Sequence, residues 1–149
     1  MILCHDNQGK VLAEVRCWAD RRLADGYSRQ AVVSLILNEE LNLKDPACLA
    51  RFVAFSRVER ELAAVMVDRN RRGKMMEREG EIDEAVTLYE ANLADQFVGS
   101  HPYERLRIIY SERGDFVNAL RVCEAAISNP FFGDMEGFVE WREWYRLRL

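Results

Sequence analysis

Residues suited to catalysis or metal binding are few in this sequence, and their spacing favours neither role. The two histidines, His5 and His101, belong to no HExxH or HxH pattern of the kind that binds zinc. Cys4 directly precedes His5, and adjacent residues do not share one face of a helix. The sequence also has no glycine-rich phosphate loop and no GxSxG motif. We therefore expect no catalytic residue, no metal site, no cofactor and no enzymatic activity.

The four cysteines, Cys4, Cys17, Cys48 and Cys123, form no CxxC pair, and each lies in or beside an apolar stretch. No stretch approaches the ~20 apolar residues that a membrane span needs. Polar residues directly follow residues 1–3, so no signal-peptide core is formed. These features predict a cytoplasmic protein without a membrane association, whose cysteines are free thiols packed in the interior.

Only three of the 21 basic residues are lysine, and arginine is the residue best suited to bind carboxylates or phosphates. The densest basic run comprises Arg69, Arg71, Arg72, Lys74 and Arg78. On a helix these side chains spread over more than one face, few aromatic residues lie nearby, and the net charge of the chain is -4. We therefore favour a solvated, partly ion-paired face and regard nucleic acid as an unlikely partner. A nucleic-acid-associated regulator that uses residues 69–78 is the alternative.

Ala, Leu, Glu and Arg dominate the composition, and three prolines are all that occur, which predicts an all-α fold. A Gly-x4-Ala pattern punctuates the chain at Gly26, Gly80 and Gly114. Glycine at such positions permits the positive φ with which a helix ends and the chain reverses. Gly80 lies closer along the chain to Gly114 than to Gly26, so additional residues separate the first turn from the other two.

These turns, and the apolar spacing between them, predict the helices. Ser28, Asp83 and Asp115 follow the glycines, and we expect each to cap the next helix by accepting a backbone N–H bond. We expect Ala85 and Ala119, which follow Gly80 and Gly114 at the same interval, to lie where two helices approach closely. The predicted helices cover residues 11–24, 29–43, 46–79, 82–95, 102–113, 116–128 and 134–149. We expect the third to be one long helix, and a break near 68–70 is the alternative.

Residues 66–132 resemble the tetratricopeptide repeat family, whose pattern places large, small and aromatic residues at fixed spacing in a pair of helices. The interval from Gly80 to Gly114 equals the period of this family, which is about 34 residues. The later repeat matches the pattern at Tyr103, Leu106, Tyr110, Gly114, Ala119, Ala126 and Pro130, and the earlier one at Gly73, Gly80, Ala85 and Tyr89. The departures in the later repeat are Arg107, Cys123 and a proline that comes one position early. Those in the earlier repeat are Met76, Asn92 and the absence of the proline. The resemblance implies antiparallel helical hairpins stacked as a short right-handed superhelix with a concave partner-binding face.

We accordingly interpret residues 1–149 as a single all-α domain with four parts. Residues 9–44 form a degenerate N-terminal hairpin, and residues 46–65 form an inserted helical segment outside the repeat pattern. Residues 66–132 are the two tetratricopeptide-like repeats, and residues 134–149 form an aromatic capping helix.

By the same resemblance, side chains on the first helix of each repeat line a groove for a protein or peptide partner. These side chains are Asn70, Lys74, Glu77, Arg78, His101, Glu104, Ile108 and Glu112, which we expect on one continuous surface. Asn70 and Lys74 are similar to the pair with which some members bind a peptide carboxylate, but the second repeat has no matching set of cations. Solvated groove residues without a specific ligand are the alternative. The leading interpretation is a non-enzymatic adaptor or regulator that binds a peptide or a partner helix.

Phe138, Trp141, Trp144 and Tyr145 make residues 134–149 the most unusual stretch of the chain. Three of them have i, i+3, i+7 spacing and share a helical face, which can cap the apolar edge of the last hairpin. Trp144 falls about 60° from Trp141 and widens this face, so the four residues are also a candidate interface to a partner or a second copy. A self-assembling, homodimeric structural protein is therefore a third interpretation.

Overall fold

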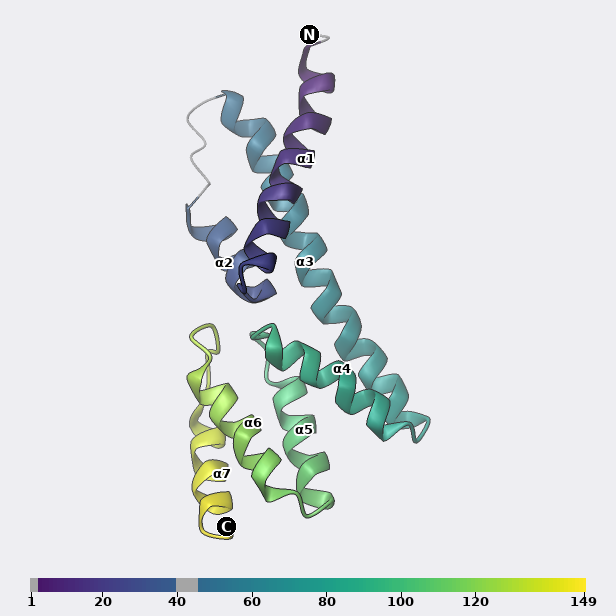
Figure 1. Cartoon of the computed structure of the whole chain (residues 1–149), viewed down its shortest axis with the longest axis vertical. Helices are drawn as coiled ribbons and strands as arrows, with labels where there is room; N and C mark the ends of the chain where they lie inside the picture. The colour runs from purple at the N-terminus through teal and green to yellow at the C-terminus, as the bar shows by residue number, and fades with distance from the viewer. Residues whose placement is uncertain (1–2, 40–45) are drawn as a thin grey trace. The chain divides into compact units, whose positions relative to one another are not determined.

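The computed structural model describes residues 3–39 and 46–149, and within them the side chains of residues 8–37 and 49–149 (Figure 1). Within these ranges every regular element is an α-helix, which confirms the all-α fold class. The helices are α1 (Leu3–Ala24), α2 (Arg29–Glu39), α3 (Pro46–Arg78), α4 (Ile82–Ala94), α5 (His101–Glu112), α6 (Phe116–Ser128) and α7 (Glu136–Arg146). The predicted extension of the second helix beyond residue 39 lies outside the described residues.

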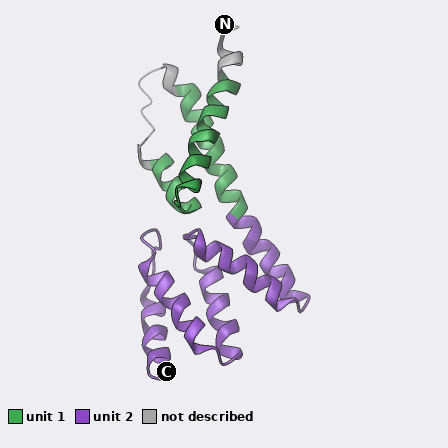
Figure 2. Cartoon of the chain, in the orientation of Figure 1, with its two compact units in different colours: residues 1–65 green, residues 66–149 purple. Residues whose placement is uncertain are grey.

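The chain divides into two compact units, residues 1–65 and 66–149, although the sequence analysis treated it as one domain (Figure 2). The boundary coincides with the predicted junction between the inserted segment and the first repeat. Helix α3 contributes its first part to unit 1 and its second part to unit 2. It runs from residue 46 to residue 78 without the alternative break near 68–70, which confirms the prediction of one long helix.

Unit 1 is built from α1, α2 and the first part of α3. Its core joins Val15 of α1, Val32 of α2 and Phe55 of α3, all of them buried. Trp18 packs edge-to-face against Phe55, with the ring centres 5.5 Å apart. Residues 46–65 are therefore not an insertion beside a hairpin, because they share its core. The repeat pattern assigns no position to such a third helix, and this is why the sequence analysis set it apart.

The predicted turns all form, and two of the three predicted caps are present. Gly26, Gly80 and Gly114 have φ values of 97°, 80° and 71°, in the region that favours glycine. The Ser28 hydroxyl accepts a bond from the Ala31 N–H at 3.1 Å, and the Asp115 carboxylate accepts one from the Asn118 N–H at 3.1 Å. The prediction for Asp83 is wrong. Glu81 occupies the cap position of α4 without a side-chain bond, and Asp83 lies in the first turn of that helix.

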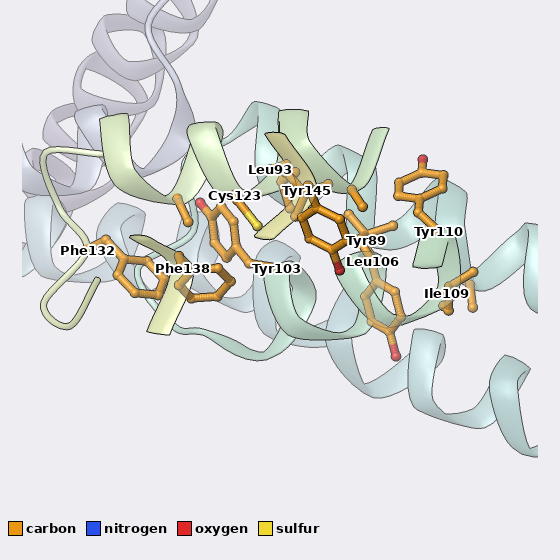
Figure 3. Close-up of a cluster of buried hydrophobic side chains, with 14 residues drawn as sticks. Tyr89, Leu93, Tyr103, Leu106, Ile109, Tyr110, Cys123, Phe132, Phe138 and Tyr145 are labelled. Atoms are coloured by element: carbon orange, nitrogen blue, oxygen red, sulfur yellow. The ribbon is translucent and has the colours of Figure 1, made fainter. Parts of the chain in front are cut away.

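Unit 2 is built from the second part of α3 and from α4 to α7, around one aromatic core (Figure 3). Ala85 and Ala119 are fully buried in this core, as expected for positions of close helix approach. Figure 3 shows Tyr103, Phe132 and Phe138 together in one part of the core, where each ring meets the others edge-to-face at 5.2 to 6.2 Å.

Two departures from the repeat pattern hold neighbouring helices of unit 2 together. Asn92 is fully buried, and its amide donates to the Met66 carbonyl at 2.8 Å and to the Asn70 side chain at 2.9 Å. Arg107 is also buried, and one of its amino groups donates to the Tyr145 hydroxyl at 3.3 Å. Asn92 thus fastens α4 to α3, and Arg107 fastens α5 to α7. Each replaces a small residue of the pattern by a polar contact between helices.

Helix α7 covers the apolar side of α6, as the capping interpretation requires. Phe138 and Tyr145 are buried in the same core as Val122 and Ala126 of α6. Phe138 and Tyr145 were predicted as interface residues, and this part of the prediction is wrong because both belong to the interior of unit 2. Of the four aromatic residues, Trp141 and Trp144 alone keep a substantial exposed surface.

Candidate functional site

A groove of about 590 Å3 opens between the second part of α3 and α5 in unit 2. Its walls are lined by Lys74, Glu77, Arg78, Ile82, His101, Arg105, Ile109, Glu112 and Arg113. Five of the eight predicted groove residues are among them: Lys74, Glu77 and Arg78 from α3, and His101 and Glu112 from α5. The structure therefore brings residues of α3 and α5 together at one hollow.

The other three predicted groove residues do not line it. The Asn70 side chain accepts a bond from Asn92 and so faces α4. Glu104 pairs with Arg107 at 3.1 Å and lines a separate hollow on the side of α5 that faces α7. Ile108 is replaced in the groove by its neighbour Ile109.

The error has a geometrical cause. One residue along a helix corresponds to a rotation of about 100°, so Glu104 and Ile108 lie a third of a turn from Arg105 and Ile109. Sequence reasoning missed Ile82, Arg105, Ile109 and Arg113. The spacing of 101, 105, 109 and 112, which follows one face of a helix from His101, is the signal that could have found Arg105 and Ile109.

A network of polar side chains forms the floor of the groove. Glu77 accepts bonds from the Arg105 guanidinium at 2.6 and 3.0 Å and from the Tyr89 hydroxyl at 2.7 Å. His101 lies 3.4 Å from the same hydroxyl, and its ring packs edge-to-face against that of Tyr89. The network spans α3, α4 and α5, and therefore sets the position of the groove walls before any ligand arrives.

The electrostatics of the floor stabilise one protonation state. Burial on its own would raise the pKa of Glu77, but the bonds from Arg105 and Tyr89 bring it below its ordinary value. Burial, together with the Glu77 carboxylate, raises the pKa of Tyr89. Burial and the charge of Lys74 lower the pKa of His101. At neutral pH the floor thus combines a carboxylate, a protonated phenol and a neutral imidazole, an arrangement suited to a fixed scaffold.

The cations that line the groove differ in whether they form ion pairs with other described residues. Arg105 is engaged by Glu77, and Arg113 pairs with Asp83 at 2.7 Å. Lys74 and Arg78 form no ion pair with any described residue. Four basic side chains and two carboxylates line the groove, which gives it a formal charge of +2 in a chain whose net charge is -4.

The basic run that includes these cations is divided among three surroundings. Arg69 is mostly buried, and its guanidinium pairs with Asp95 at 2.5 Å. Arg71 and Arg72 both pair with Asp68, at 2.6 and 3.9 Å, on the exposed surface of α3. Lys74 and Arg78 alone reach the groove. The run therefore presents no single basic face.

The two cysteines whose side chains are described differ in their exposure to solvent. Burial raises the pKa of Cys123 to about 11, so that it remains a thiol at neutral pH. Cys17 is exposed, which contradicts the expectation that it is packed in the interior. The side chains of Cys4 and Cys48 lie outside the described part. Within that part, no group of three or more histidine, cysteine or acidic side chains is arranged to hold a metal ion.

Comparisons with family models, curated proteins and solved structures find no match to this chain. The similarity to tetratricopeptide repeats thus rests on the sequence pattern and stays a prediction. None of the described helices combines the length and apolar character of a membrane span.

Proposed function

We propose that this chain is a non-enzymatic protein-interaction module, an adaptor or regulator, whose groove between α3 and α5 binds a peptide or a helix of a partner protein. One observation carries the proposal. Lys74 and Arg78 stand beside the apolar side chains of Ile82 and Ile109, and neither cation has an ion-pair partner among the described residues. Apolar anchors flanked by unpaired charge are what a specific peptide site requires.

The network under the groove supports this role, because it limits the cost of binding. Glu77, Tyr89 and Arg105 hold one another by hydrogen bonds before a ligand is present. A wall that is already ordered loses little conformational entropy when a ligand binds. Most of the conformational entropy lost on binding would therefore be lost by the ligand and not by the groove.

The charge and the apolar side chains that line the groove together indicate the chemistry of the ligand. A carboxylate of the ligand would pair with Lys74 or Arg78, while an apolar side chain one helical turn away would rest on Ile82 or Ile109. The ligand that fits is an acidic amphipathic segment. Glu112 is the rim carboxylate that would reject a second acidic residue at the far end.

The finer architecture belongs to this proposal as well. In it, α3–α4 and α5–α6 are two successive hairpins of a short right-handed superhelix, and α7 is its cap. Supporting observations are the equivalent turns at Gly80 and Gly114 and the full burial of Ala85 and Ala119, two pairs that share one interval along the chain. A cytoplasmic location, expected in the sequence analysis, is the remaining part.

Selection of peptides from a displayed library on the full chain, followed by calorimetry, tests the groove. Lys74→Glu with Arg78→Glu should weaken a selected acidic peptide by tenfold or more, since tenfold corresponds to about 1.4 kcal/mol. The matched control is Arg71→Glu with Arg72→Glu. It makes the same change of charge on the same helix, at exposed residues outside the groove. Selected peptides that tolerate the first pair as well as the second would reject the groove.

The same two variants separate the nucleic-acid alternative. Binding to phosphates would fall steeply with added salt and would weaken in both variants, because each removes two cations from α3. Binding of an amphipathic peptide would respond to the groove pair and depend less on salt. A single-stranded oligonucleotide titrated at two salt concentrations provides the measurement.

A further inference from the structure

Helix α7 exposes more aromatic surface than its capping role requires. Trp141 and Trp144 keep 37% and 36% of their surface exposed, although Phe138 and Tyr145 on the same helix are buried. The two indoles meet edge-to-face, with ring centres 5.7 Å apart. Tryptophan is concentrated at the energetic centres of protein interfaces, so an adjoining pair at a surface marks a contact region.

Neighbouring side chains hold both indoles in place. The Arg107 guanidinium lies over the ring of Trp141 at 4.0 Å, and that of Arg148 lies over Trp144 at 3.3 Å. Phe116 of α6 meets Trp144 edge-to-face at 5.7 Å. The rings are therefore ordered in advance, which reduces the entropy lost when a partner covers them.

The charges of α7 divide into those that are satisfied within the chain and those that are not. Arg142, Arg146 and Glu143 take part in ion pairs with one another or with α6. Glu136 and Glu140, near the start of the helix, form no ion pair with any residue of the described part. The same holds for Arg148, just after its end, which donates only to the Trp144 carbonyl. The helix thus has unpaired acids at one end and an unpaired base at the other.

Two of these three unpaired charges, Glu140 and Arg148, lie on the side of Trp144. With about 100° per residue, Glu140 and Arg148 are each about 40° from Trp144 around the helix, and Gly137 is about 20° from it. A Cβ added at Gly137 would meet no atom within 4 Å, so the surface there is open. The exposed side of α7 therefore runs from acidic side chains through an open position and two indoles to a guanidinium.

We propose that the chain forms a homodimer in which two copies of α7 pack antiparallel across a two-fold axis, with Trp141 of each copy against Trp144 of the other. An antiparallel pair in this register brings Arg148 of one copy level with Gly137 of the other, between Glu136 and Glu140. The glycine leaves room for the guanidinium. The two-fold symmetry repeats every contact, so the unpaired acids and the unpaired Arg148 of each copy of α7 all gain partners. This inference does not depend on the proposed function, because the groove between α3 and α5 has no residue of α7 in its lining.

Sedimentation velocity of the full chain across a dilution series tests the dimer. The wild type should change from the mass of one chain to that of two as the concentration rises. Trp144→Ala should weaken association about 10- to 100-fold, as expected for an interface centre. Arg148→Glu should weaken it about tenfold or more, because two equivalent contacts become repulsive. Arg60→Glu is the matched control, since Arg60 is exposed in unit 1 and bonds only to its own helix.

A charge exchange decides the orientation of the helices. Glu136→Arg with Glu140→Arg should also weaken association, and adding Arg148→Glu to this pair should restore it, because the exchanged charges again face each other. Circular dichroism of each variant confirms that it is folded. A wild type that stays monomeric at every concentration overturns the proposal. So does a dimer that tolerates Trp144→Ala and Arg148→Glu, and so does a triple variant that remains as weak as its parents.

Discussion

The backbone of Gly73 lies directly against the ring of Tyr89. A Cβ added at Gly73 would stand 2.5 Å from Cε1 of the ring, closer than two carbon atoms can approach. The ring cannot move aside freely, because it is fully buried and its hydroxyl donates to Glu77. The small residue of the repeat pattern is therefore required here by a buried side chain that bonds to Glu77 in the groove.

Gly73→Ala should consequently destabilise unit 2. Overpacking costs about 1–3 kcal/mol, which is offset in part by the gain of about 1 kcal/mol that alanine brings to a helix interior. Gly9→Ala provides the control, because Gly9 is also helical and a Cβ there meets nothing. It should raise the free energy of unfolding measured in urea. Equal stability of Gly73→Ala and the wild type would mean that the ring of Tyr89 yields easily.

Ala119→Leu tests the close approach of helices in the second hairpin. Ala119 is fully buried, so the larger side chain should cost about 1–3 kcal/mol through overpacking. Ala64→Leu makes the same change at an exposed position of α3 and should leave the thermal midpoint nearly unchanged. Matching midpoints for the two variants would contradict the assignment of Ala119 to a close contact.

The lowered pKa of Glu77 predicts an acid-sensitive contribution to stability. Because the pKa is lower in the folded than in the unfolded state, this contribution is fully present above the ordinary value of 4.5 and is lost as the pH falls through the lowered value. Glu77→Gln should be less stable at pH 7 and should lose less stability on acidification below about pH 4.5. Urea unfolding at several pH values measures this. Parallel pH profiles for the two proteins would exclude a special role of this carboxylate.

Protonation of His101 should also lower the stability of the protein as the pH falls, but in a higher pH range than Glu77. Its pKa is lowered, so the unfolded chain takes up the proton more readily than the folded one, and stability falls as the pH decreases below the ordinary value of 6.5. His101→Gln should remove this upper part of the pH dependence. The two variants together therefore divide the acid sensitivity of the groove floor between two residues.

Phe138→Ala and Trp144→Ala distinguish the two sides of α7. Phe138 is buried against Tyr103 and Phe132, so its loss should cost about 3–5 kcal/mol. Trp144 is partly exposed, so Trp144→Ala should reduce the stability clearly less when the chain is dilute enough to be monomeric. Thermal unfolding at low concentration is the measurement. A larger loss for Trp144 than for Phe138 would show that the cap depends on the outer face.

Local signals in the sequence predicted the helices well. The turns at Gly80 and Gly114 could be predicted because the positive φ that they require is a property of a single residue. Helix α6 also has the predicted bounds. The division into two units was not predictable in this way. No residue interrupts α3 near Val65. The two units are defined by contacts between side chains that are distant in the sequence, and no local sequence pattern contains this information.

The groove was predicted in place but not in register. Transfer of positions from the earlier repeat to the later one selected Glu104 and Ile108, whereas α5 turns Arg105 and Ile109 toward α3. The rotation of α5 is set by its buried side chains, and Arg107 is among them although it occupies the position of a small residue. A buried arginine that bonds to α7 is a long-range feature, so the repeat pattern could not place this side of α5 in the interior.

Because Cys123 is buried, the rate at which its thiol is chemically modified should report how often unit 2 opens. Its thiol has no exposed surface, so a thiol reagent can modify it only in molecules whose core has opened. In a variant whose other three cysteines are serine, the labelling rate would report how often α6 separates from its neighbours under native conditions. A peptide bound in the groove or a second copy on α7 would slow this labelling if it stabilises the closed core. Binding of a peptide in the groove or of a second copy on α7 could therefore be followed as a change in the labelling rate of Cys123 in a colorimetric assay.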